Sequence, residues 1–309
     1  MSAEPELSVV ITTKNEAANI ANAINAFADF RSRVEIIVVD NQSDDDTKAI
    51  ATTLGATVLD KGPERSAQRN LGWRTARASW VIVLDADMIL PPDTITEIFD
   101  RIVESSNRRI LESSNPRIVE SSNPRIVESS NPQIDKSTNR RIDEFPSAYW
   151  IPEVRTGSGF RVKARNFERS FYDGTCVDAL RLFHKSVLEA TGGYDENLIA
   201  GPEDWELDIR VLATGAKCAV LGHHLIHNEK RLTYKRMLEK KAYYTKSFAA
   251  YRAKWPKHPA VKKQFSPWYR FVGVFVEKGK WKKILRHPIL FAGVMFERFS
   301  VGVVYLLNR

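Results

Sequence analysis

An Asp-x-Asp pair stands at the end of a short apolar run. Asp85 and Asp87 directly follow Val81–Leu84. If this run is a buried strand, the two-residue alternation of its side chains turns both carboxylates the same way. Mg²⁺ and Mn²⁺ prefer oxygen ligands and are often held by one or two carboxylates together with substrate phosphates. The pair therefore predicts a divalent-cation site that a diphosphate completes; the alternative is that the acids only cap a turn.

Two earlier apolar runs also end in polar residues. Thr12, Thr13 and Glu16 lie at the end of the first run, and Asp40 closes the second. Ligands of open α/β sheets bind at the carboxyl ends of the strands, so these residues would share one rim with the Asp-x-Asp pair. Such a rim suits one nucleotide. The polar residues after Asp40 suit turns and helix caps, whereas we assign Asp40 mainly as a ligand.

The elements that position these residues alternate in type. Runs rich in Val and Ile predict buried strands, and amphipathic stretches between them predict helices. The predicted strands are 7–13, 34–40, 80–87, 148–154, 180–183 and 217–222, and the predicted helices are 16–30, 47–54, 64–78, 185–191 and 203–213. This alternation favours a mainly parallel sheet with right-handed crossovers, which is the α/β class.

Residues 101–145 differ from the rest of the chain. Isoleucines recur there every eight residues within copies of Arg-Ile-Val-Glu-Ser-Ser-Asn-Pro. An eight-residue period does not match a helix, and Pro116, Pro124 and Pro132 would break one. We interpret the segment as a low-complexity insertion in a surface loop, mobile and dispensable for chemistry; the alternative is a repetitive partner-binding arm.

The charge of the chain is concentrated near its C-terminus. Residues 228–309 hold 20 Lys and Arg against 4 Asp and Glu, a net +16, so the first 227 residues carry −8 of the total +8. A basic segment of this size indicates an anionic partner, either nucleic acid or acidic lipid. Its aromatic and apolar content favours lipid, and we expect no nucleic acid partner.

The last apolar segment, Ile289–Leu307, is about long enough to span a bilayer. Glu297 and Arg298 lie at its centre, where Arg alone would cost about 2.5–3.5 kcal/mol in lipid. We therefore expect an interfacial helix on an anionic membrane surface, at the cytoplasmic face. The alternative is that these helices pack on the catalytic domain without lipid.

Cysteines and the N-terminus add little. Cys176 and Cys218 have no metal-ligand spacing, so neither a disulfide framework nor a zinc site is predicted. The first residues lack a basic stretch followed by an apolar core, so we expect no secretory signal and a cytoplasmic protein. A dinucleotide-binding Gly-x-Gly-x-x-Gly motif does not follow the first strand, which argues against a dehydrogenase.

Five ordered motifs resemble those of a known family. They are Val9–Glu16, Val38–Ser43, Leu84–Asp87, Gly192–Asp195 and Gly201–Leu207. Over about 7–100 and 148–230 the chain resembles glycosyltransferase family 2, and the ordered set is more specific than any one motif. The resemblance implies the A-type glycosyltransferase fold and sugar transfer with inversion at the anomeric carbon.

The resemblance also assigns roles. The residues expected to bind the nucleotide sugar are Thr12, Thr13, Glu16, Asp40, Arg65, Arg69 and Asp85. Asp87 is the first choice of ligand for Mn²⁺ or Mg²⁺, with Asp85 beside it and His227 as a third ligand. A structural role for His227, with His224 as its substitute, stays open. For Arg65 and Arg69, the alternative that they are solvated charges on a helix surface also stays open.

Glu203 and Asp204 are the expected catalytic pair. By the resemblance, Asp204 takes the proton of an acceptor hydroxyl that attacks the anomeric carbon opposite the departing nucleoside diphosphate, whose charge the cation stabilises. A carboxylate of ordinary pKa is a weak base near neutral pH, so this role requires burial and a second acid nearby. The alternative is that both acids only complement a helix dipole.

Together these features predict a metal-dependent inverting transferase that moves one sugar from a UDP-, GDP- or dTDP-sugar to a hydroxyl acceptor, with a lipid-linked acceptor as one case. Polysaccharide, glycolipid or cell-envelope glycan synthesis is the expected setting. The Gln-x-x-Arg-Trp motif of processive relatives does not follow Asp204, which favours single-sugar transfer. A sugar-nucleotide nucleotidyltransferase would need a Gly-rich first loop. A non-catalytic lipid or nucleic-acid binder is the other alternative.

The expected organisation has four parts. Residues 1–100 would form the nucleotide-sugar half of the catalytic domain, and 146–230 the acceptor half. The insertion 101–145 separates the two halves, and 231–309 would form a basic, aromatic, helical region that associates with a membrane.

Overall fold

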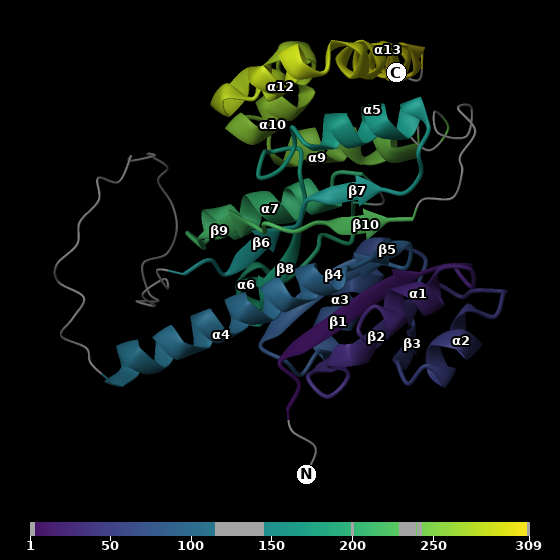
Figure 1. Cartoon of the computed structure of the whole chain (residues 1–309), viewed down its shortest axis with the longest axis vertical. Helices are drawn as coiled ribbons and strands as arrows, with labels where there is room; N and C mark the ends of the chain where they lie inside the picture. Colours follow the sequence, from purple (N-terminus) through teal and green to yellow (C-terminus); the bar gives the residue numbers. More distant parts are fainter. Residues whose placement is uncertain (1–3, 115–144, 199–200, 229–238, 240–242, 308–309) are drawn as a thin grey trace.

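The computed structural model describes residues 4–114, 145–198, 201–228, 239 and 243–307. A seven-stranded sheet lies at its centre, in the order β3-β2-β1-β4-β8-β6-β9 (Figure 1). The strands are β1 (Leu7–Thr13), β2 (Val34–Asp40), β3 (Thr57–Asp60), β4 (Trp80–Asp85), β6 (Ala148–Trp150), β8 (Leu180–His184) and β9 (Cys218–Val220). The first four strands along the chain are parallel to one another, whereas β8 runs antiparallel to its neighbours β4 and β6.

The parallel register brings the predicted strand ends together. Within the sheet, β1 lies between β2 and β4, with Thr12 opposite Asp85 and Thr13 opposite Asp40. Both faces of β1 are covered, as a continuous apolar run predicts. Val9 and Ile11 pack with the helices at Ile20–Asn25 (α1) and Pro92–Ser114 (α4). On the other face, Val10 packs with those at Arg65–Thr75 (α3), Lys185–Thr191 (α6) and Glu203–Ala213 (α7).

Helices cover the two faces of the sheet. Those of the catalytic part are α1 (Ile20–Asn25), a 3-10 turn η1 (Ala28–Phe30), α2 (Thr47–Thr53), α3 (Arg65–Thr75), α4 (Pro92–Ser114), α5 (Phe160–Arg169), α6 (Lys185–Thr191) and α7 (Glu203–Ala213). A second, three-stranded sheet is ordered β5-β10-β7, with β5 at Met88–Ile89, β7 at Glu153–Arg155 and β10 at Leu225–His227.

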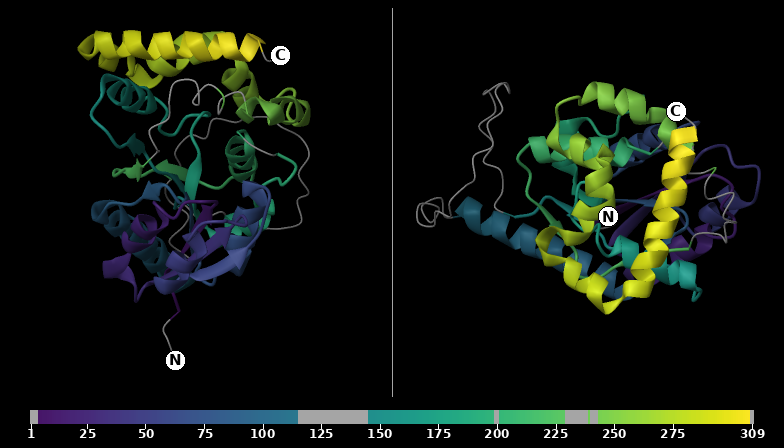
Figure 2. Two further views of the ribbon diagram at one scale, coloured as in Figure 1. Left: turned by 90° about the vertical axis from the view of Figure 1, so that its right-hand side faces the viewer. Right: turned by 90° about the horizontal axis from the view of Figure 1, so that it is seen from above.

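The C-terminal region is helical, as predicted, and packs over α5. Its elements are η3 (Thr245–Ser247), α9 (Phe248–Lys254), α10 (Pro259–Phe265), the π-helical η4 (Tyr269–Gly273), α11 (Val274–Val276), η5 (Glu277–Gly279), α12 (Trp281–Arg286) and α13 (Pro288–Leu307). Figure 2 shows α13 as the outermost element at the end of the molecule opposite the N-terminus. Among the described residues, no helix combines the length and the apolarity needed to cross a membrane.

Several predicted boundaries were wrong. The predicted strand 148–154 is two strands in different sheets, separated at Pro152, which has no N–H to donate to a ladder. The predicted helix 16–30 begins only at Ile20. The N–H groups of Asn15 and Ala17 instead donate to side chains of the loop after β2, at Ser43 and Asp45, which keeps this stretch out of a helix.

Three short strands, β3, β5 and β10, were not predicted, and the strand predicted at 80–87 ends at Asp85. Helix α4 also runs into the segment 101–145, as far as Ser114. The first octapeptide copy has Arg108 where later copies have proline, and the residue before a proline such as Pro116 is disfavoured in a helix. The predictions for the remaining copies, including their mobility, fall on 115–144, outside the described residues.

Candidate active site

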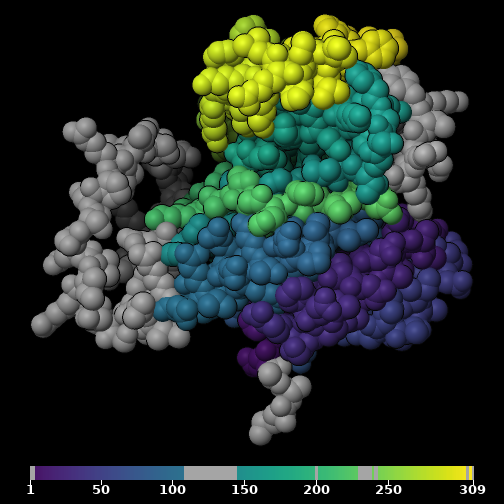
Figure 3. Space-filling view, viewed as in Figure 1, coloured from purple at the N-terminus to yellow at the C-terminus, as the bar shows by residue number. Residues whose placement is uncertain are grey.

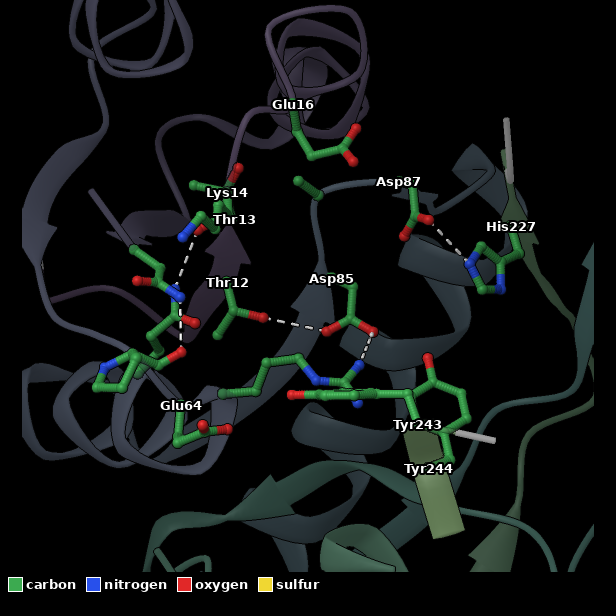
Figure 4. Close-up of a pocket in the computed structure, with 15 residues that line it drawn as sticks. Thr12, Thr13, Lys14, Glu16, Glu64, Asp85, Asp87, His227, Tyr243 and Tyr244 are labelled. Carbon is green, nitrogen blue, oxygen red and sulfur yellow. Dashed lines mark hydrogen bonds and ion pairs between the residues drawn. The ribbon is translucent and has the colours of Figure 1, made fainter. Parts of the chain in front are cut away.

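A cavity of about 410 Å³ opens where β1 and β4 end (Figure 4). Cavities of this size hold small-molecule ligands and cofactors. Its walls come from strand ends, from the start of α3, from β10 and from the residues just before η3. The lining residues are Thr12, Thr13, Lys14, Glu16, Asn41, Pro63, Glu64, Arg65, Gln68, Asp85, Ala86, Asp87, His227, Tyr243 and Tyr244. The cavity therefore joins most of the predicted strand-end residues.

Asp85 is held by arginines. Its carboxylate accepts a hydrogen bond from the Thr12 hydroxyl at 3.1 Å and pairs with Arg69 at 3.2 Å and Arg65 at 3.7 Å. Burial alone would raise the pKa of Asp85, but the two guanidinium groups outweigh it and hold that pKa well below the ordinary range. Asp85 is therefore a charged carboxylate committed to Arg65 and Arg69.

The same two arginines reach the second acidic pair. Arg69 Nη1 donates to Asp204 Oδ1 at 2.7 Å, and Arg65 Nη2 donates to Glu203 Oε1 at 3.1 Å. The solvated-surface alternative is wrong for Arg69, whose exposed fraction is 0%. Arg65 and Arg69 thus tie the end of β4 to the first turn of α7, although Asp85 and Asp204 are 119 residues apart in sequence.

Burial also acts on the acidic pair. It raises the pKa of Glu203, assisted by the nearby Asp204 carboxylate and opposed by Arg65. The raised pKa thus belongs to Glu203, whereas the Asp204 carboxylate is held in place by a charge-assisted hydrogen bond from Arg69. Neither Glu203 nor Asp204 lines the cavity. Arg65 and Arg69 connect the first turn of α7 to the cavity wall at Asp85.

Replacing Arg69 with Met is expected to lower the free energy of unfolding by about 3–5 kcal/mol, because it leaves Asp85 and Asp204 without their buried partner. Urea unfolding measures this change. Arg74 on the same helix is the matched control: its side chain is 52% exposed and its pair with Glu196 is a surface contact. Arg74→Met should change stability by less than about 1 kcal/mol. Equal effects of the two substitutions would contradict a bridging role for Arg69.

Asp87 and His227 form a separate pair across the cavity. Asp87 follows β4, and His227 ends β10, opposite Met88 in the small sheet. His227 Nε2 lies 3.0 Å from Asp87 Oδ2, and Nδ1 lies 2.9 Å from Glu153 Oε1. Burial lowers the pKa of His227, but hydrogen bonds to Asp87 and Glu153 outweigh it and raise that pKa to about 9. His224 is exposed and does not line the cavity.

The donor set at this pair fits a divalent cation in part. A carboxylate oxygen and an imidazole nitrogen face one cavity, and a carboxylate on the other ring nitrogen is the usual way a metal-binding histidine is oriented. Within the described ranges, however, no three His, Cys, Asp or Glu side chains are grouped to hold a metal on their own. Asp85, the other predicted carboxylate ligand, pairs with arginines instead, so phosphate and water oxygens would have to complete the shell.

The remaining predicted nucleotide contacts differ in their surroundings. Thr13 lines the cavity with a buried hydroxyl that has no hydrogen-bond partner, as expected of a ligand-binding group. Glu16 also lines it and accepts a hydrogen bond from Asn19. Asp40 does not line it: its side chain is fully buried and accepts hydrogen bonds from the backbone and hydroxyl of Ser43. Asp40 thus stabilises the turn that follows β2, which is the alternative role considered for this region.

Four residues that shape the site were not predicted from the sequence. Gln68 donates to the carbonyl oxygens of Thr13 and Val39 and fixes two strand ends. Glu153 orients His227, and its position within an apolar run was a usable signal. Tyr243 and Tyr244 line the cavity, and the Arg65 guanidinium lies 5.7 Å from the Tyr244 ring. Two tyrosines within a basic segment give no such signal.

Several known sequences similar to this chain are named as glycosyltransferases. An uncharacterized glycosyltransferase of Rickettsia prowazekii is 42% identical over 95 residues, which is 30% of this chain and 32% of that protein. The succinoglycan biosynthesis protein ExoO of Rhizobium meliloti is 32% identical over 103 residues, 31% of this chain and 30% of that protein. The match thus spans about a third of the length of these curated relatives.

Solved structures confirm the predicted fold. A mannosyltransferase of Pyrobaculum calidifontis, in complex with GDP-Man and Mn²⁺, has a TM-score of 0.54 at 15% identity, covering 97% of this chain and 76% of that one. S. aureus TarS 1-349, in complex with UDP-GlcNAc, has a TM-score of 0.51 at 15% identity, covering 94% and 81%. The seven-stranded sheet flanked by helices is thus an A-type glycosyltransferase fold.

The family model described as Glycosyl transferase family 2 matches residues 8–192. This range includes β1, β2 and β4, which carry Thr12, Asp40 and Asp85 at their ends. Since the match covers more than half of the chain, the chain belongs to glycosyl transferase family 2.

Proposed function

We propose that this protein transfers a single sugar, with inversion, from a nucleotide-sugar donor to a hydroxyl acceptor, with Mn²⁺ or Mg²⁺ as cofactor. One observation carries the proposal: Asp87, His227 and Arg65 face one cavity at the carboxyl edge of a parallel sheet. Anion-binding and cation-binding groups side by side are what a diphosphate and its metal ion require.

The donor would lie along the edge of the sheet. Thr12, Thr13 and Glu16 line the side of the cavity at the end of β1, where base and ribose would bind. Arg65 has a third of its side chain exposed and offers a guanidinium to phosphate oxygens, a geometry that suits bidentate contacts. The Asp40 carboxylate would have to accept a hydrogen bond from the nucleotide base in addition to those from Ser43, so this contact with the nucleotide stays a prediction.

Asp87 and His227 would hold the cation, with Glu153 fixing the imidazole ring. When bound, the cation would neutralise the developing charge of the leaving diphosphate. His227 must release its proton to act as a ligand, so cation and proton compete for Nε2.

Asp204 would act on the acceptor side. Its carboxylate is oriented by Arg69 through Oδ1 and would accept the proton of the attacking hydroxyl. Glu203, buried beside it, would keep the first turn of α7 attached to Arg65. Inversion would require the bound sugar to lie between Asp204 and the diphosphate, so that the acceptor hydroxyl attacks the anomeric carbon opposite its leaving group.

The similar proteins support this class of reaction. The Pyrobaculum structure holds GDP-Man and Mn²⁺, the TarS structure holds UDP-GlcNAc, and the Rhizobium relative acts in succinoglycan biosynthesis. We therefore propose a role in polysaccharide, glycolipid or envelope-glycan synthesis, with the donor among UDP-, GDP- and dTDP-sugars.

A thermal-shift screen of UDP-, GDP- and dTDP-sugars, each with and without Mn²⁺, is expected to identify one donor class that raises Tm only when the cation is present. A ligand at a hundred times its Kd stabilises the folded state by about 2.7 kcal/mol. Adenosine diphosphate ribose with Mn²⁺ is the control for non-specific diphosphate binding. If no sugar nucleotide raises Tm beyond that control, the proposed donor site is wrong.

A further inference from the structure

Helix α13 is oriented with its charged residues, Glu297 and Arg298, toward α5. Arg298 is 9% exposed; its Nε donates to Glu168 of α5 at 2.8 Å, and its guanidinium lies 4.4 Å from the Phe275 ring. Glu297 pairs with Arg165, also of α5, at 3.4 Å. The two charges that argue against a membrane span are thus neutralised against the protein.

The packing of α13 on α5 is close, which fixes this orientation. A Cβ atom added at Gly293 would lie 2.8 Å from Cε1 of Phe160 and 3.5 Å from Cβ of Ala164, both on α5. Val294, beside this glycine, is 2% exposed. The side of α13 that faces away from α5 is therefore a stable surface of the molecule.

Among the described side chains, that outward side is apolar apart from Ser300, whose hydroxyl donates to the Phe296 carbonyl oxygen at 3.0 Å. Its residues recur at helical spacing and are largely exposed: Ile289 (73%), Phe296 (71%), Phe299 (64%), Val303 (54%), Leu306 (66%) and Leu307 (79%). Leu285 and Trp281 of the adjacent α12 are 72% and 46% exposed. We call the exposed apolar residues of α12 and α13 the apolar face. Contiguous exposed apolar surface of this kind marks a contact site.

Basic side chains border the apolar face. The segment Glu277–Arg286 holds five Lys or Arg and one acid, and Lys278, Lys282 and Arg286 are exposed. Figure 3 shows α12 and α13 together covering one end of the molecule. An apolar helix surface rimmed by cations and tryptophan complements the anionic headgroups and acyl boundary of a bilayer. A second copy of the chain would instead place these cations opposite one another.

We propose that the apolar face docks on an anionic lipid bilayer, with α13 lying flat in the interface and its Glu297–Arg298 pair turned toward α5. The chain then needs no spanning helix to stay at a membrane. The inference goes beyond sugar transfer and does not rest on it, because docking uses residues of α12 and α13 alone and none that lines the cavity.

The test is flotation of the full chain with vesicles of phosphatidylcholine, with or without phosphatidylglycerol. We expect binding only to the anionic vesicles. Phe296→Ser with Leu306→Ser should weaken it at least about a hundredfold, because two exposed apolar side chains no longer enter the interface. Val103→Ser with Leu212→Ser, at exposed apolar positions on α4 and α7, is the matched control and should bind as the wild type does.

The charges are tested separately. Lys282→Gln with Arg286→Gln should weaken binding to anionic vesicles roughly thirtyfold, whereas Lys48→Gln with Arg74→Gln on the nucleotide half should not. Circular dichroism melting verifies that each variant is folded. Undiminished vesicle binding by the Phe296/Leu306 variant would overturn the proposal. So would a lipid-free dimer, seen by analytical ultracentrifugation, that this variant converts to a monomer.

Discussion

Asp204→Asn is expected to lower kcat for Mn²⁺-dependent donor turnover by about 10²–10⁴-fold, the usual contribution of a general base. The amide keeps the size and the hydrogen-bond acceptor that Arg69 uses, but it cannot take a proton. Donor affinity, measured by isothermal titration, should change little, because Asp204 does not line the cavity. A large loss of kcat with unchanged donor affinity would distinguish a general base from a residue that only supports the structure of the site.

Asp93→Asn is the matched control for this variant. Asp93 is the second residue of α4, as Asp204 is the second residue of α7, and both lie in the first turn of their helices. If helix-dipole stabilisation were the whole role of Asp204, the two substitutions would have similar effects of about 0.3–1 kcal/mol on stability and none on kcat. A normal kcat in Asp204→Asn would remove it from the mechanism.

Asp87→Ala is expected to abolish the Mn²⁺-dependent part of the donor thermal shift and to lower kcat/KM by about 10³-fold. The substitution removes the carboxylate that lies 3.0 Å from His227 Nε2, leaving a single protein ligand for the cation. The measurements are thermal shift with nucleoside diphosphate and Mn²⁺, and hydrolysis of the donor.

Asp60→Ala is the control, because Asp60 also ends a strand at this edge of the sheet but its side chain is 63% exposed and pairs with Lys48. It should behave as wild type in both assays. A full Mn²⁺ response in Asp87→Ala would mean that the cation binds elsewhere, and the role assigned to the Asp87–His227 pair would have to be withdrawn.

The sequence predicted the fold best where burial is continuous. β1 contains Val9–Ile11 and β2 contains Ile36–Val39; both strands are buried along almost their whole length, and their predicted bounds match the structure. β3 is only four residues long and half exposed, so it lacks that signal. The start of α1 depended on which backbone N–H groups bond to side chains of the loop after β2, and such long-range hydrogen bonds cannot be predicted from hydrophobic periodicity.

The sequence predicted most residues of the site but not which of them contact one another. Strand-end position alone grouped Thr12, Asp85 and Asp87 around one cavity. Which carboxylate pairs with which arginine depends on how α3 and α7 pack against each other. The ion pairs of Asp85 with Arg65 and Arg69 could therefore not be predicted from the sequence. The Asp40 carboxylate likewise accepts a hydrogen bond from Ser43, three residues away, instead of facing the cavity. The position of Asp40 in its motif does not predict this local hydrogen bond.

The walls of the cavity extend well past the segment that the family model matches. That segment ends at residue 192, whereas His227, Tyr243 and Tyr244 all face the cavity. Truncating the gene at the matched boundary, a common route to a tractable fragment, would therefore discard one side of the binding site along with the first turn of α7. For expression and crystallisation, the minimal working unit has to reach at least into the helices that follow Tyr244.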